Sequence, residues 1–203
     1  MANDTNYWGL RPVKHIGGAP WNGVTEKCYI SVLYATAMYI GDTVMIDNEL
    51  NDAEPTAMYS TIERSAIGSA SVIYGVITSF DDHVSCSKLY NPALTERYAN
   101  VVTDPTVVYH IRGNGIDTPT RVTPFLNAIM VAGTSSTVTG LSGIGLDEGT
   151  TDPATTITYP LTILRAANLP DNELGDNTIW EVLINNHQLR AGATGNVTGV
   201  TKG

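Results

Sequence analysis

The chain has 203 residues, of which 42% are hydrophobic and 15% are charged, and its formal net charge is −9. This acidic balance disfavours nucleic acid and anionic membranes as partners, because both attract proteins with a surplus of Lys and Arg. The length allows one sizeable domain or two small ones. Residues 1–28 hold three bases and two acids, so we expect a near-neutral N-terminal segment on an acidic body.

The N-terminal segment combines aromatic residues with residues that break regular structure. Residues 6–23 read NYWGLRPVKHIGGAPWNG, and this stretch holds two of the three tryptophans. Its glycines and prolines disfavour a helix and favour an extended path. We predict that residues 1–27 form an extended arm, and that residues 1–23 of it leave the body and dock on a neighbouring molecule. The predicted interface residues are Trp8, Leu10, Arg11, Pro12, Lys14 and Trp21. In the alternative interpretation, the two tryptophans cap the chain's own body.

The body, residues 28–189, is dominated by strand patterns, in which short runs of Val, Ile and Thr are separated by turn residues. Clear strands are expected at 41–47, 71–80, 106–111, 157–164 and 178–184. Gly75, inside one of these runs, indicates a bulge or a close approach of two backbones. Residues 55–68 fit a short helix and a strand with a loop equally well, and residues 123–131 allow one helical turn.

These patterns predict an all-β fold, a β-barrel or a β-sandwich, with little helix. A division of the body into two sub-domains near residues 95–115 is left open. The tail, residues 190–203, holds only small residues and valine as apolar groups, so we expect it to be flexible. No basic region followed by an apolar run begins the chain, so we expect no signal peptide, and no apolar run reaches membrane-spanning length. Without export, Cys28 and Cys86 are expected to be reduced and half-buried.

Signatures of enzyme chemistry are weak. The four histidines lie far apart without a second His or Cys at metal-ligand spacing, so no metal site is predicted. The residues SCSK at 85–88 match a serine–lysine motif, but they fall in a loop or strand instead of at a helix start. Acidic turns at 146–152 and 171–176 lack the spacing of a calcium loop. We therefore predict no catalytic residue, no cofactor and no enzymatic activity.

Several phrases of the sequence resemble a known group of proteins. GLRPVKHIGGAPWNG (9–23), YANVVTDPTVVYHI (98–111), STVTGLSGIGLD (136–147) and LPDNELGDNTIWEVLINNHQL (169–189) are similar to small virion proteins of tailed bacteriophages. The stretch from GDTVMID to SASVIYGVITSF (41–80) resembles the barrel of head-decoration, or cement, proteins. The long acidic turns leave open which face would meet the shell.

The resemblance implies a non-enzymatic structural protein that binds the outside of the capsid and holds neighbouring capsomers together. It implies the major capsid protein as partner, a homotrimer, and a place on the virion after assembly in the bacterial cytoplasm. No direct nucleic-acid or membrane partner is expected. A tail or neck component of the virion is one alternative, and a carbohydrate- or receptor-binding β-domain is another.

Overall fold

The computed structural model describes residues 3–47, 55–56, 58–82, 86–115 and 124–190. In these residues it has twelve strands and no helix, and all the strand pairs are antiparallel. The predicted all-β class is therefore confirmed, and the two main sheets are consistent with a sandwich-type body. The expected tail falls almost wholly outside the described residues. Because no helix occurs in the described part of the chain, none there is long and apolar enough to cross a membrane.

Sheet 1 is formed by one continuous part of the chain and has the strand order β2-β6-β5-β3-β4. Its apolar face buries side chains such as Ile30, Val44 and Ile77 in a core of its own. The strands are β2 (Glu26–Ile30), β3 (Thr43–Ile46), β4 (Ile62–Arg64), β5 (Gly75–Phe80) and β6 (Arg97–Val102).

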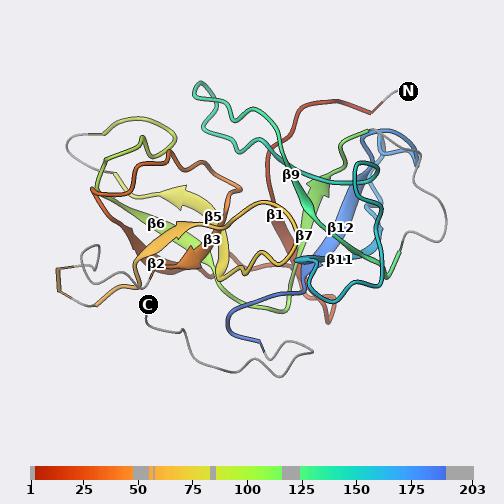
Figure 1. The fold of residues 1–203 in the computed structure, drawn as a ribbon, viewed down its shortest axis with the longest axis horizontal. Helices are drawn as coiled ribbons and strands as arrows, with labels where there is room; N and C mark the ends of the chain where they lie inside the picture. Colours follow the sequence, from red (N-terminus) through yellow and green to blue (C-terminus); the bar gives the residue numbers. More distant parts are fainter. Residues whose placement is uncertain (1–2, 48–54, 57, 83–85, 116–123, 191–203) are drawn as a thin grey trace.

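Sheet 2 brings together strands from both ends of the chain in the order β1-β7-β12-β11-β8. Its strands are β1 (Arg11–His15), β7 (Val107–Arg112), β8 (Asn127–Ala128), β11 (Leu161–Ala166) and β12 (Ile179–Ile184). A two-stranded ribbon, β9 (Met130–Ala132) with β10 (Ile144–Leu146), adds side chains to a second, larger core, which sheet 2 also lines. Figure 1 shows sheet 1 and sheet 2 at opposite ends of the molecule's long axis.

The larger core joins the two sheets. Trp180, Val182 and Ile184 of β12 pack with Tyr109 and its neighbours on β7, as the alternation of both strands predicts. Val76 and Val102, from β5 and β6 of sheet 1, belong to the same cluster, so its packing links the sheets. The chain passes from sheet 1 to sheet 2 between the end of β6 and the start of β7.

The structure settles one open alternative and shortens one expected strand. Residues 55–68, read equally well as a helix, contain the short strand β4 and no helix among their described residues. The strand expected at 157–164 begins only at Leu161, because the segment before it bends and Asn185 binds its backbone at Ile157 and Tyr159. Gly75 makes the close approach that was predicted, since an added Cβ there would overlap the carbonyl oxygen of Val102.

The N-terminal segment crosses the junction between the two sheets. Gly9 donates its N–H to the carbonyl of Ile144 at 3.2 Å, and Leu10 donates to the carbonyl of Gly41 at 3.0 Å. Gly9 and Gly41 both have positive φ, 74° and 92°, and a Cβ on either would overlap the other's part of the backbone. Only glycine fits both the conformation and the space, so this pair fixes the point where the segment crosses.

Candidate functional site

The outer face of sheet 2, opposite the core, gathers basic side chains from three strands around an acidic one from a fourth. The strand registers place Arg11 of β1 and Glu181 of β12 on either side of His110 of β7, and Arg165 of β11 beside Glu181. Directly paired residues in antiparallel strands project to the same face. Arg112, two residues after His110, also projects there. We call this surface, made of Arg11, Lys14, His110, Arg112, Arg165 and Glu181, the basic face.

Lys14 reaches the basic face through a β-bulge. Arg11 and Lys14 are three residues apart, so a regular strand would project them to opposite faces. The register of β1 against β7 shifts between Pro12 and Lys14, and Lys14 then pairs with Val108 on the face of His110. Pro12 is tolerated because β1 is an edge strand.

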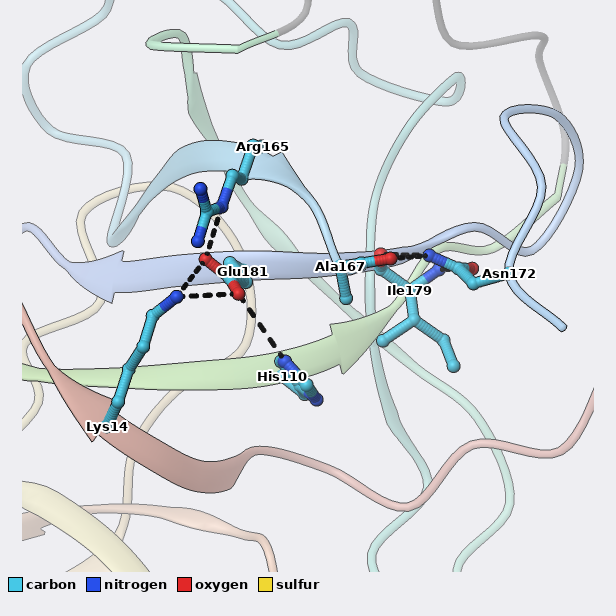
Figure 2. A network of polar contacts seen from close by, with 7 residues as sticks. All are labelled: Lys14, His110, Arg165, Ala167, Asn172, Ile179 and Glu181. Atoms are coloured by element: carbon cyan, nitrogen blue, oxygen red, sulfur yellow. Dashed lines mark hydrogen bonds and ion pairs between the residues drawn. The ribbon is translucent and has the colours of Figure 1, made fainter. Parts of the chain in front are cut away.

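Glu181 lies at the centre of the basic face, as Figure 2 shows, and its side chain is only 8% exposed. Lys14 Nζ donates to its two carboxylate oxygens at 2.8 and 2.7 Å. Arg165 Nε donates to Oε2 at 2.8 Å, and His110 Nε2 lies 3.9 Å from Oε1. The carboxylate is thus surrounded by donors from three strands, which fixes the positions of the Lys14 and Arg165 side chains.

The charge state of this cluster follows from its contacts. Burial would raise the pKa of Glu181, but the hydrogen bonds from Lys14 and Arg165 outweigh it and lower the pKa. Burial lowers the pKa of His110, with Glu181 opposing and Lys14 assisting the shift. Glu181 is therefore ionised and His110 neutral near pH 7. A carboxylate held by two cations is a poor proton acceptor, so the cluster suits binding better than acid–base chemistry.

Trp8 extends the basic face toward the N-terminus. The guanidinium carbons of Arg11 and Arg112 lie 4.6 and 4.2 Å from the centre of its ring. Both distances fit cation–π contacts. Arg112 is 5% exposed, whereas Arg11 is exposed. The Nη2 atom of Arg112 is 3.8 Å from Oδ2 of Asp4, whose side chain is 58% exposed. The tryptophan thus holds one buried and one exposed guanidinium in place.

The structure corrects the expectation that residues 1–27 form an arm leaving its own body. For residues 3–23, the described segment docks in cis, because β1 is hydrogen-bonded into sheet 2 and Leu10 is 1% exposed in the larger core. Trp21 is half-buried against the same core, and Trp8 is half-buried under the two arginines. The alternative interpretation, in which both tryptophans pack on the chain's own body, agrees with these contacts.

Of the six predicted interface residues, the structure brings three together. Trp8, Arg11 and Lys14 belong to one surface, whereas Leu10 is in the core, Pro12 lies in β1 and Trp21 packs against the core. That these residues contact a partner stays a prediction.

Four members of the basic face were not predicted as site residues: His110, Arg112, Arg165 and Glu181. The alternation of residues 106–111 and 178–184 does place His110 and Glu181 opposite their core faces. Alternation does not reveal which strands are neighbours in the sheet. The pairing of β7 with β12 and β1 is what brings these positions into one row.

A second titratable group, Glu148, lies in the interior near sheet 2. Its side chain is 5% exposed, and Oε1 accepts a hydrogen bond from Nε1 of Trp180. Burial raises the pKa of Glu148 to about 7, and the nearby Asp176 and Asp147 add to the rise, against the hydrogen bonds from Trp180 and the Gly115 backbone. The carboxyl packs against Gly113, where a Cβ would overlap it. The burial of Glu148 and its contacts with Trp180 and Gly113 favour a structural role.

The described residues hold no group of three or more His, Cys, Asp or Glu side chains that could bind a metal ion. Cys28 and Cys86 are free thiols and both are buried, more deeply than expected. Burial, with a smaller effect of Glu26, raises the pKa of Cys28 to about 12. This thiol is therefore protonated and poorly reactive at neutral pH.

No family model matches the chain, and comparisons with curated proteins and with solved structures find no match either. The resemblance to bacteriophage virion proteins therefore stays a prediction that depends on the sequence phrases alone.

Proposed function

We propose that this chain is a non-enzymatic binding protein whose basic face docks on an acidic protein surface. The observation that carries the proposal is the concentration of charge. Of the 11 Lys and Arg residues in a chain of net charge −9, four lie on this one face: Arg11, Lys14, Arg112 and Arg165. Such a patch on an acidic molecule attracts an anionic partner to this face, while the acidic remainder of the surface repels the same partner.

The face suits a protein partner for a further reason. Trp and Arg are the residue types that most often anchor interfaces, and Trp8 stacked with Arg11 and Arg112 supplies both. Glu181 holds Lys14 and Arg165 in fixed conformations, so less side-chain entropy is lost when they bind. Nucleic acid is the less suitable anion, because the rest of the surface is acidic.

The sequence phrases suggest what this partner is. We infer that the chain is a structural protein of a tailed-bacteriophage virion, that it binds the outside of the capsid as a cement protein, and that it does so as a homotrimer. The major capsid protein is then the partner that supplies the acidic surface. The resemblance supports this finer proposal, and the basic face supports the coarser one.

The test is co-sedimentation with purified capsid shells that lack this protein. Replacing both Arg11 and Arg165 by Glu should weaken binding at least about tenfold, because two attractive pairs become repulsive. Raising the salt concentration should weaken the wild-type complex, since the exposed pairs are screened. The matched control is Lys88→Glu, which reverses an exposed charge in the loop between β5 and β6.

Each outcome separates the proposals. Binding unchanged by the double reversal, or lost equally in the Lys88→Glu control, would refute the basic face as the docking surface. Failure of the wild-type chain to bind capsids, with binding to tails or necks instead, would replace the cement role by the tail or neck role. Native mass spectrometry of the bound form should show a trimer, whereas a six- or twelve-membered ring would favour the tail or neck.

A further inference from the structure

A pocket of about 390 Å³ opens at the end of the basic face. It lies between the N-terminal residues, the end of β7 and the loop that precedes β12. Arg112 contributes the cationic part of the lining, and Leu169, Pro170 and Ile179 contribute the apolar part. Asn172 also lines the pocket, but its amide is committed to the backbone of Ala167 and Ile179.

Arg112 is unusual among buried cations because most of its hydrogen-bonding capacity is unused. Its side chain is 95% buried, yet Nε and Nη1 have no hydrogen-bond partner. Buried guanidinium groups are normally paired and hydrogen-bonded, since a buried unpaired charge is costly. The ring of Trp8 stabilises the positive charge, but a ring face accepts no in-plane hydrogen bond. An anion at the Nη1–Nη2 edge of this guanidinium would supply the acceptor that Nη1 lacks.

Asp4 lies where such an anion would bind but does not replace it. Its Oδ2 atom is 3.8 Å from Nη2 of Arg112, which is too long for a hydrogen bond. Its Oδ1 atom instead accepts hydrogen bonds from the backbone and side chain of Asn6, at 3.2 and 3.0 Å. The carboxylate is therefore turned toward its own loop, and its 58% exposed side chain can move aside.

We propose that this pocket binds a carboxylate carried on a short apolar stem. The carboxylate takes the Nη1–Nη2 edge of Arg112 in a bidentate pair, displacing Asp4, and the stem packs on Leu169, Pro170 and Ile179. A dianion such as phosphate fits less well, because one guanidinium would face it together with the carboxylates of Asp4 and Asp171, which also line the pocket. Two sources share this chemistry: the C-terminal residue of a protein chain and a free short-chain acid.

The experiment is a titration of the full chain, labelled with ¹⁵N, with sodium hexanoate. The signals followed by NMR are Nε–H of Arg112 and the indole N–H of Trp8. Hexan-1-ol is the control ligand, since it keeps the apolar stem and lacks the charge. We expect saturable shifts with hexanoate and at least tenfold weaker binding of hexan-1-ol. Equal affinities for the two ligands, or tighter binding of inorganic phosphate than of hexanoate, would overturn the proposal.

Two variants test the role of Arg112 independently. Arg112→Gln should weaken hexanoate binding about tenfold or more, because a charge-assisted pair is lost. Asp4→Asn should strengthen it several-fold, because a competing carboxylate is removed from an exposed position. Asp152→Asn makes the same charge change outside the pocket lining and should have no effect. If Arg112→Gln does not fold, Asp4→Asn decides: an affinity equal to that of the wild type would refute the competition.

Peptides distinguish the two sources. Acetyl-Gly-Leu with a free carboxylate is compared with its C-terminal amide and with hexanoate. Tighter binding of the free peptide than of both others points to a protein chain end, and tighter binding of hexanoate points to a free acid. Either result supports the carboxylate site. Equal binding of the peptide and its amide, with no binding of hexanoate, would refute it. None of these outcomes depends on whether the partner of the basic face is a capsid.

Discussion

Glu148→Gln should change how the stability of the fold depends on pH. In the folded chain the pKa of Glu148 is raised from 4.5 to about 7, so the folded state holds its proton more tightly than the unfolded state. The stability that this proton provides is fully present below pH 4.5 and is lost as the pH rises through 7. A difference of about 2.5 pKa units corresponds to about 3 kcal/mol. Glutamine keeps an oxygen to accept the Trp180 N–H but does not ionise.

The wild-type chain should hide this effect, because His187 titrates in the opposite sense. Burial lowers the pKa of His187 from 6.5 to about 4, so its contribution to stability is present above pH 6.5 and is lost as the pH falls through 4. The two opposing terms are similar, about 3 kcal/mol each. Between pH 4.5 and 6.5 they nearly cancel for this pair. Removing the Glu148 carboxyl should leave the His187 term uncompensated.

The assay is urea unfolding followed by tryptophan fluorescence at intervals from pH 4.5 to 7.5. The free energy of unfolding of Glu148→Gln should match the wild type near pH 4.5 and exceed it by about 3 kcal/mol near pH 7.5. Glu96→Gln, which changes an exposed carboxyl, is the control and should show no such trend. A difference that stays within about 0.5 kcal/mol across the range would refute the reasoning about the buried carboxyl.

The remaining predictions concern the backbone crossing and the thiols. Gly9→Ala should lower the free energy of unfolding by about 3 kcal/mol or more, because the added methyl would overlap Gly41. Gly18→Ala is the control: Gly18 also has positive φ but has open space around it, so the loss should be about 1 kcal/mol. Thermal unfolding of both variants measures the difference. Cys28 and Cys86 should resist iodoacetamide in the native chain and give two adducts in urea without reductant, as intact mass would show. A single adduct or none in urea would contradict the free thiols.

Local patterns predicted the strands better than they predicted their partners. The alternation in 106–111 and 178–184 was enough to place Tyr109 and Trp180 in the core, because each strand has one apolar face. The tryptophan-containing segment was read as an arm because its pairing partner, β7, lies far along the chain. An edge strand with Pro12 and a bulge carries no alternation signal of its own.

The same limit applies to the basic face and the pocket. Arg11 and Lys14 were both predicted as interface residues, but on a regular strand they would project to opposite faces, and the bulge brings them to the same face. Arg112 lies at the end of a strand among apolar residues, so the sequence gives no sign that its guanidinium is buried against the ring of Trp8. Contacts of this kind depend on tertiary packing, which spacing along the chain does not encode.

The docking of the N-terminal segment has a consequence for the order of synthesis and folding. Asn3 donates its amide to the carbonyl of Glu173, 170 residues later, and β1 pairs with β7. At roughly 5–20 residues per second, the ribosome needs about ten to thirty seconds to span that interval. Sheet 1 can close from contiguous residues during this time, while Leu10 emerges early and the core that buries it is completed only by β12. Leu10, near the start of the chain, therefore stays exposed until β12, near the end of the described residues, has been synthesised.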